Sequence, residues 1–376
     1  MNRFRLLAAS SRNASPSSHI QSRHYCHTHS YASYFHVKFH RKSVVQQQCR
    51  CFSLPSILVP PAMFLGLGIT LWIQKCLAMI IFQNKIIYMP SIPPLARWET
   101  IEDYAPECRP IQWREESIKS EDGVKISLIV GDAEGEQVKA NVASDDEVHL
   151  VILYFQGNAS SLPPRLPFLS SIIKKTKKVH QISFVALSYR GYWHSQGKPS
   201  QKGIERDARA AMQWVLRQYS QVPNVRISFW GQSVGAGAAT GLAAEYLEKG
   251  DSEHPPLVCL VLETPFTNMR DLLRDFYPQK WLPYHYLSPF LRNHWDSEQA
   301  LRRIARAPGL QKPNILIAQA EQDEIVPRQQ SERLETFCRS LDITVNRHIV
   351  PKALHNDVMV KADGQKAIAD FLSQHI

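Results

Sequence analysis

The fold of this chain is decided by the stretch Ile227–Thr240, which reads Ile-Ser-Phe-Trp-Gly-Gln-Ser-Val-Gly-Ala-Gly-Ala-Ala-Thr. An apolar run, a Gly-x-Ser-x-Gly turn and a run of small residues together predict a strand, a sharp turn and a helix. Glycines flank the serine because the strand and the helix approach closely at such a turn. The turn holds its serine hydroxyl exposed above the sheet, so Ser233 is a candidate nucleophile. A glycine-rich turn without chemistry is the alternative.

Strands and helices are predicted to alternate along most of the chain. Apolar runs predict strands at 148–155, 182–188, 225–230, 257–263, 314–318 and 343–350. Helical stretches fall at 165–179, 202–219, 235–249, 328–341 and 364–375. A hairpin is expected at 116–130 around Asp122-Gly123, followed by a polar surface loop at 131–147. This alternation predicts an α/β fold with a mostly parallel sheet, whose active site forms at the carboxyl ends of its strands.

The segment 264–312, called the insertion below, interrupts this alternation. It is too long for a simple connection, and it gathers aromatic residues and prolines. We expect it to form a small helical lid over Ser233, which suits a substrate with a hydrocarbon part. A structural insertion that packs on its own core is the alternative.

A serine nucleophile needs a base to take its proton, and histidine is the usual one. In this type of fold the order along the chain is serine, acid, histidine. His355 lies in the loop after the last predicted strand and is the preferred candidate. His348 lies within that strand and His375 on the terminal helix, so neither points naturally at the serine.

The acid should follow the strand at 314–318 and orient the imidazole. Asp323 is the preferred candidate, because it lies in the turn before Ile325-Val326-Pro327 starts the next helix. Glu321 and Glu324 are the alternatives.

The developing oxyanion of the transition state needs two preorganised donors. The backbone N–H of Val234, directly after the nucleophile, is expected to supply one. The second is expected from the backbone N–H of Asn158, in the loop after the strand at 148–155, where Gly157 permits a close backbone approach.

Basic residues are unevenly distributed. The first 98 residues carry 11 of the 44 lysines and arginines and none of the 34 acidic residues. The remaining chain is close to neutral, so the basic balance does not indicate nucleic-acid binding. Residues 1–54 are rich in Ser, His and Arg and are expected to be disordered. The same composition resembles a mitochondrial targeting peptide, which is the second interpretation.

An apolar segment follows at 57–82. From Pro61 to Phe82 it has 22 residues, enough for a helix to cross about 30 Å of hydrocarbon. We expect a single transmembrane anchor, with a buried N-terminal helix as the alternative. Basic residues are denser before the segment than after it, which favours a cytosolic N-terminus and a main domain on the other side of the membrane. An endomembrane of the endoplasmic-reticulum type is favoured, and a mitochondrial membrane is the alternative.

The seven cysteines do not form a disulfide pattern, because they are odd in number and widely spaced. Cys259 lies inside the apolar run 257–262 and is expected in the core. Cys26-His27-Thr28-His29 and Cys49-Arg50-Cys51 lack the paired spacing of a zinc site. We therefore expect neither a metal nor a cofactor.

Further motifs accompany the turn at Gly231–Gly235. They are Gly157-Asn158-Ala159, Ser188–Tyr192 with Ser195, Gly197 and Pro199-Ser200, Glu263–Asn268, Asp323 with Val326-Pro327, His355-Asn356-Asp357, and Asn84–Pro90 after the apolar segment. With them, residues 85–375 resemble the membrane-anchored α/β-hydrolase-domain serine hydrolases. That group includes monoacylglycerol and lysophospholipid lipases and protein depalmitoylases. One position departs from the group, which usually has His where this chain has Gln156.

The resemblance implies an α/β-hydrolase fold over 85–376, with Ser233, Asp323 and His355 as the triad. It also implies that Asn158 and Val234 form the oxyanion hole, and that Arg190 and Gly191 hold loops structurally. We therefore expect a serine hydrolase that cleaves acyl esters or thioesters of a lipid-like substrate near a membrane through an acyl-enzyme. A serine peptidase of the same fold and a catalytically weak membrane-tethered scaffold are the alternatives.

Overall fold

The computed structural model describes residues 55–134, 148–177, 181–250, 254–283, 286–308 and 311–375. The expectations for residues 1–54 and for most of the polar loop at 131–147 therefore lie outside the described residues.

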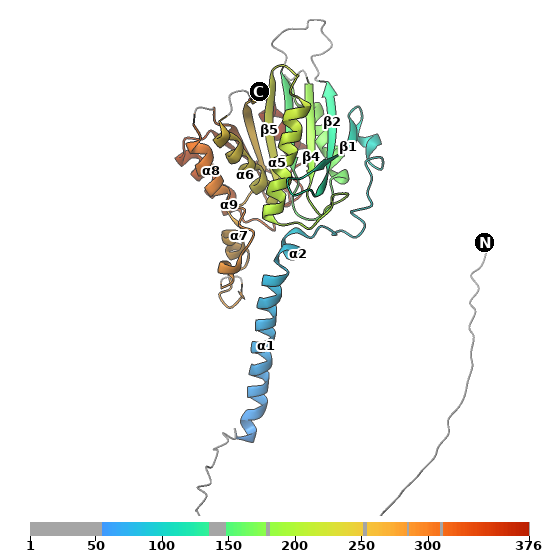
Figure 1. The fold of residues 1–376 in the computed structure, drawn as a ribbon. Coiled ribbons are helices and arrows are strands. Elements are labelled where there is room, and N and C mark those ends of the chain that lie inside the picture. Colours follow the sequence, from blue (N-terminus) through green and yellow to red (C-terminus); the bar gives the residue numbers. More distant parts are fainter. Residues whose placement is uncertain are drawn as a thin grey trace, which may run out of the picture. The chain divides into compact units, whose positions relative to one another are not determined.

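An eight-stranded sheet forms the centre of the fold (Figure 1). Its strand order is β1-β2-β4-β3-β5-β6-β7-β8. The pairs β1–β2 and β2–β4 are antiparallel, and all the others are parallel. The strands are β1 (Gln112–Lys119), β2 (Lys125–Glu134), β3 (His149–Phe155), β4 (Gln181–Ser188), β5 (Val225–Gln232), β6 (Leu257–Glu263), β7 (Asn314–Ala320) and β8 (Val345–Val350). The predicted α/β fold with a mostly parallel sheet is confirmed.

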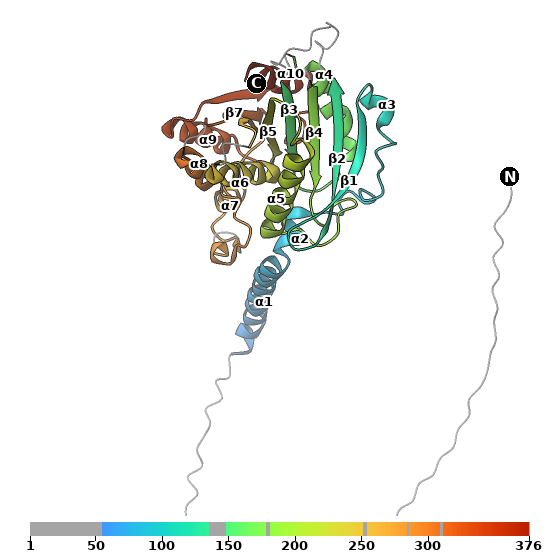
Figure 2. The same ribbon diagram turned by 45° about the horizontal axis from the view of Figure 1, so that its top comes forward.

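Helices cover both faces of the sheet (Figures 1 and 2). One apolar core lies between the sheet and α5, α6, α8 and α9, and the other lies between the sheet and α3, α4 and α10. These helices are α3 (Ala105–Cys108), α4 (Leu166–Lys175), α5 (Gln201–Gln218), α6 (Val234–Lys249), α8 (Ser297–Arg306), α9 (Arg328–Ser340) and α10 (Ala362–Gln374). Because both faces are covered, β3 is buried at every position, as its unbroken apolar sequence predicts.

The predicted hairpin is confirmed, with Gly123 at φ +81° in the turn between β1 and β2. The predicted surface loop starts too early, since β2 continues to Glu134. The polar end of β2 is stabilised by pairing with β1 and β4 and by contacts of Asp132 with Arg114 and Ser183. Helix α4 is also shorter than predicted, because Thr176 leaves the helix with an extended backbone.

A long apolar helix, α1 (Val59–Ile81), precedes the sheet and leads into the short helix α2 (Gln83–Tyr88). With a rise of 1.5 Å per residue, α1 is about 35 Å long. The helical stretch Ser56–Ile81 is long and apolar enough to cross a membrane, and its most apolar part is not buried against the described protein. This agrees with the segment predicted as an anchor and argues against the alternative of a buried helix.

The insertion contains α7 (Met269–Phe276), a 3₁₀ turn at Ser288–Phe290, and α8. Trp295 packs on α6, since a Cβ placed on Gly237 would lie 3.1 Å from the Cβ of Trp295. The part around α7 and the 3₁₀ turn lies beside the end of α1 that leads into α2 (Figures 1 and 2). The insertion is therefore helical in part, and it rests on both the sheet domain and α1.

Candidate active site

Ser233 lies at the turn between β5 and α6. Its backbone has φ +52° and ψ −116°, a conformation that is rare for residues other than glycine. The N–H of Ser233 donates to the carbonyl of Glu263 at 2.8 Å, which fixes the strained turn against β6. Strain of this kind persists only where the surroundings impose it, and it gathers at functional sites.

Two glycines make this turn possible. A Cβ on Gly231 would lie 2.1 Å from the carbonyl oxygen of Gly235. A Cβ on Gly235 would lie 2.1 Å from the carbonyl oxygen of Phe155 and 2.5 Å from that of Gln156. A larger residue at either position would force the surrounding backbone to shift, and Gly235 brings α6 directly against the loop that follows β3.

His355 and Asp323 are brought together by the loops after β8 and β7. The Nδ1 of His355 lies 2.9 Å from both carboxylate oxygens of Asp323. Both side chains are buried, with 1% and 5% of their surface exposed. The carboxylate also accepts from the backbone N–H groups of Ile325 and Val326, at 2.9 Å and 2.7 Å. It is thus held rigidly, and an acceptor at Nδ1 favours the tautomer that leaves Nε2 unprotonated.

The Nε2 of His355 has no hydrogen-bond partner among the described residues. This nitrogen is therefore available to take a proton. The loop that carries it starts at the carboxyl end of β8, and β5, β6, β7 and β8 all run parallel, so this loop and the turn at Ser233 lie at the same edge of the sheet.

The alternative acids have other partners. Glu324 accepts from the backbone N–H of His355 at 2.9 Å, and Glu321 accepts from that of Lys352 at 2.8 Å. Both therefore brace the loop that holds the histidine. His348 pairs with Asp363 on a half-exposed surface, away from Asp323. Of the candidate acids, the structure pairs only Asp323 with the ring of His355 in the described part of the chain.

The loop after β3 approaches the turn at Ser233. Asn158 is followed by Ala159 and Ser160, both with positive φ of 56° and 61°. The N–H of Ala159 donates to the carbonyl of Tyr88 at 2.9 Å, and the side chain of Asn158 donates to that of Ile87 at 3.2 Å. These contacts fix the loop, and the backbone N–H of Asn158 has no acceptor among the described residues. Val234 begins α6, so its N–H has no intrahelical partner either.

The sequence profile of the prolyl oligopeptidase family matches residues 188–376, which is half of the chain. The chain belongs to this family of α/β-hydrolases. Protein bem46 of Schizosaccharomyces pombe is 29% identical over 224 residues, covering 60% of this chain and 67% of that protein. The lysophosphatidylserine lipase ABHD12 of Danio rerio is 31% identical over 189 residues, covering 50% of this chain but only 46% of the lipase.

The fold is shared with solved α/β-hydrolases. The crystal structure of an α/β-hydrolase from Vibrio vulnificus matches with a TM-score of 0.55 at 18% identity, covering 78% of this chain and 91% of that one. The family and its relatives thus support a hydrolase, and α1 is long and apolar enough to cross a membrane.

The sequence did not predict the buried polar network around Glu263. Glu263, at the end of β6, is fully buried and accepts from Trp230, Gln232 and the N–H of Met359 at 3.1–3.3 Å. Burial raises the pKa of its carboxyl to about 7, opposed by the positive charge of Arg165 and by these hydrogen bonds. Because Met359 follows His355 closely, Glu263 connects the histidine loop to the strand below Ser233. A carboxylate ending an otherwise apolar strand was the signal available in the sequence.

Other polar groups near the site have different roles. Arg190 pairs with Asp207 and Asp122 at 2.7 Å and 2.8 Å, which confirms its structural role. Both side-chain polar atoms of Gln156 are buried without partners among the described residues. Cys259 is fully buried, as predicted. In the described part of the chain no cluster of three or more His, Cys, Asp or Glu side chains is placed to hold a metal ion.

Proposed function

We propose that this protein is a membrane-anchored serine hydrolase that cleaves acyl esters or thioesters of lipid-like substrates. The observation that carries the proposal is the buried Asp323–His355 pair, whose free Nε2 lies at the same sheet edge as the strained Ser233. The residues 57–82 would form the anchor and 85–376 the hydrolase domain. The lysophosphatidylserine lipases ABHD12 among the relatives support this reaction class.

In the proposed reaction, the Oγ of Ser233 attacks the acyl carbonyl carbon while the Nε2 of His355 takes the hydroxyl proton. Asp323 stabilises the imidazolium, and the N–H groups of Asn158 and Val234 stabilise the oxyanion. The tetrahedral intermediate then collapses, and the alcohol or thiol leaves with the proton from His355. Water, activated by the same histidine, hydrolyses the acyl-enzyme by the reverse sequence and frees Ser233.

A lipid-like substrate is supported by two features. One relative is named a lysophosphatidylserine lipase, and α1 would hold the hydrolase domain at a membrane surface. The greater density of basic residues before α1 supports a cytosolic N-terminus and an endomembrane of the endoplasmic-reticulum type. A serine peptidase remains the second candidate, because the family profile is that of prolyl oligopeptidases.

The test is covalent labelling of the detergent-solubilised full chain with a fluorophosphonate probe. The wild type should be labelled, Ser233→Ala should not, and Ser220→Ala, which changes an exposed serine after α5, should be labelled like the wild type. Ser233→Ala should lower hydrolysis of a palmitoyl thioester or monoacylglycerol on the order of 10⁴-fold or more, as triads act as a unit.

An unlabelled but folded wild type would contradict the assignment of Ser233. A screen of monoacylglycerols, lysophospholipids, palmitoyl thioesters and short proline-containing peptides then separates the two candidates. Turnover of peptides without turnover of long-chain esters would reject the lipase in favour of the peptidase.

A further inference from the structure

A small apolar cavity lies where the end of α1, α2 and the insertion meet. Its volume is about 70 Å³. The helices contribute Met79, Ile80 and Ile87, and the insertion contributes Leu273, Leu287 and Leu291. Its walls are therefore mainly hydrocarbon, and they come from two segments about 200 residues apart in the sequence. Neither the sheet nor the candidate triad contributes to them.

One wall of the cavity is continuous with the loop expected to hold the oxyanion. Ile87 lines the cavity, and its carbonyl accepts the hydrogen bond from the side chain of Asn158 at 3.2 Å. The next carbonyl, that of Tyr88, accepts from the N–H of Ala159 at 2.9 Å. A residue that lines the cavity is thus hydrogen-bonded to Asn158, whose backbone N–H is proposed to stabilise the oxyanion.

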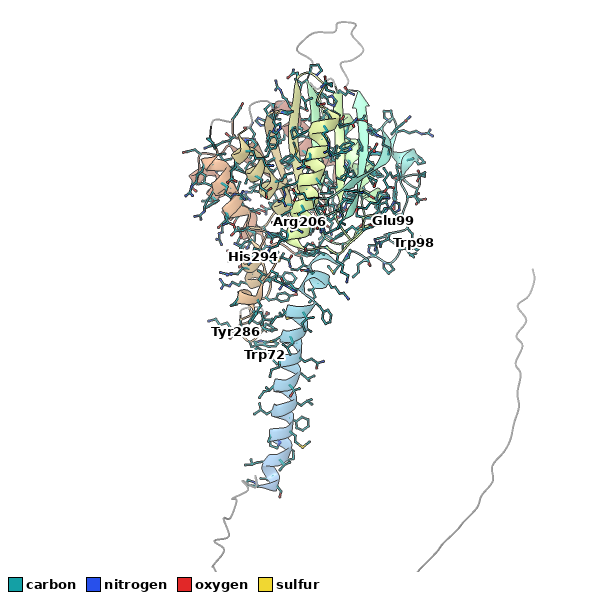
Figure 3. The ribbon with its side chains drawn as sticks, viewed as in Figure 1. Trp72, Trp98, Glu99, Arg206, Tyr286 and His294 are labelled. Atoms are coloured by element: carbon teal, nitrogen blue, oxygen red, sulfur yellow. The ribbon has the colours of Figure 1, made fainter. Side chains whose placement is uncertain are left out.

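α1 contributes Met79 and Ile80 to the cavity, and the surface of α1 before them is apolar. Ile73, Leu77 and Ile81 are about half exposed along the part of α1 that approaches the cavity. The insertion adds exposed aromatic side chains beside this helix, and the indole of Trp72 donates to the carbonyl of Trp281 at 3.4 Å. Figure 3 shows Trp72 and Tyr286 at the same level along α1. Trp and Tyr exposed together in this way are typical of the boundary between lipid and water.

The junction is held in place by polar contacts around the cavity. Arg292 of the insertion donates to the carbonyl of Ile80 at 2.8 Å, at the end of α1. Asn293 donates to Gln83 at 3.0 Å and accepts from the hydroxyl of Tyr88 at 2.8 Å. The two walls are therefore fixed relative to each other, and the cavity is a built feature of the junction.

We propose that this cavity binds the acyl chain of a membrane lipid, which enters sideways from the bilayer along α1 and presents its ester to Ser233. The inference rests on the proposed function and specifies where its substrate binds. A water-sized group fills about 30 Å³, so the cavity of about 70 Å³ admits roughly two methylene-sized groups of the chain. The rest of a long chain lies along the exposed surface of α1, within the hydrocarbon layer.

The first test fills the cavity. Leu273→Trp places a large ring in it, and Arg274→Trp places the same ring on the half-exposed neighbouring position of α7 as the matched control. Both variants and the wild type are assayed as full chains in lipid nanodiscs with p-nitrophenyl acetate, octanoate and palmitate. We expect Leu273→Trp to lower kcat/KM for palmitate about tenfold or more through KM, since each buried methylene contributes several-fold to affinity.

Acetate turnover should stay within about twofold of the wild type, and Arg274→Trp should match the wild type on all three esters. Equal losses on acetate and palmitate, or an unchanged palmitate rate in folded Leu273→Trp, would overturn the proposal.

The second test needs no turnover and covers a failure of Leu273→Trp to fold. Ser233→Ala in vesicles of phosphatidylcholine is irradiated with a palmitoyl ester carrying a diazirine in mid-chain. Cross-links should fall within 79–87 and 273–291, and excess unlabelled palmitoyl ester should suppress them. Cross-links confined to 59–76 would show lipid contact without a cavity site and overturn the proposal. Cavity cross-links without any serine labelling by fluorophosphonate would instead contradict only the assigned chemistry.

Discussion

The contact between α6 and the loop after β3 gives a sharp test through Gly235→Ala. The new Cβ would lie 2.1 Å from the carbonyl oxygen of Phe155, whereas ordinary contacts begin at 3.4 Å. Both partners are backbone, so the loop would have to retreat by more than an ångström and carry Gln156 and Asn158 with it. Overpacking of this kind costs about 1–3 kcal/mol, against a gain of about 1 kcal/mol in helix propensity.

A displacement of about 1 Å at a catalytic group lowers rates about 100-fold. We therefore expect Gly235→Ala to lose about 100-fold in kcat/KM with a small or moderate loss of stability. Gly241 lies in the same helix, and a Cβ there would meet nothing within 4 Å. Gly241→Ala should consequently keep full activity and gain up to about 1 kcal/mol, or about 2 °C in Tm.

The assay is steady-state hydrolysis of a soluble short-chain ester together with urea unfolding of the same preparations. If Gly235→Ala were as active and as stable as Gly241→Ala, the conclusion that α6 packs closely against the loop after β3 would be wrong. A loss of stability without a loss of activity would separate the packing from the chemistry and contradict the role given to Asn158.

Two further predictions concern buried carboxyls. Asp323→Asn should lower kcat/KM for ester hydrolysis about 10³- to 10⁴-fold, because an amide no longer favours the reactive tautomer of His355. The control Glu321→Gln should keep kcat/KM within about twofold of the wild type. Equal losses in the two variants would reject Asp323 as the acid of the triad. Burial raises the pKa of Glu263 from 4.5 to about 7, so its stabilising contribution is complete below pH 4.5 and is lost as the pH rises through about 7, a total of about 3 kcal/mol. The free energy of unfolding of Glu263→Gln, measured with urea, should therefore not show this decline between pH 5 and pH 8. If it fell with pH in parallel with that of the wild type, the role given to Glu263 would be wrong.

The sequence was sufficient for features with local causes. The turn at Ser233 is specified by its own glycines, and the strands follow from unbroken apolar runs such as the one that forms β3. The pairing of His355 with Asp323 could be anticipated because parallel strands deliver their following loops to one edge of the sheet. The end of β2 could not be predicted from the sequence, because its polar residues stay in the strand only through their partners on β1 and β4.

The polar network and the junction with α1 depend on contacts between distant parts of the chain. Glu263 appeared only as part of a motif, and its burial beneath Ser233 depends on Trp230 and Gln232 of β5 and on Met359, which lies more than 120 residues later in the chain. The insertion was expected over the serine because its aromatic content suggested a lid. Its contacts with Gln83 and Ile80 could not be anticipated, because no local pattern links the insertion to a helix some 200 residues earlier.

The hydrogen bond from the N–H of Ala159 to the carbonyl of Tyr88 links the end of α2 to the candidate active site. The residue that ends α2 holds the loop proposed to stabilise the oxyanion, and its hydroxyl contacts Asn293 and Trp295 of the insertion. If the proposed site is correct, replacing α1 and α2 with an unrelated membrane span would remove a support of the loop that carries Asn158. On the proposed assignment the site is complete only when α2 is present, so a fragment that begins after α2 is expected to be less active than the full chain.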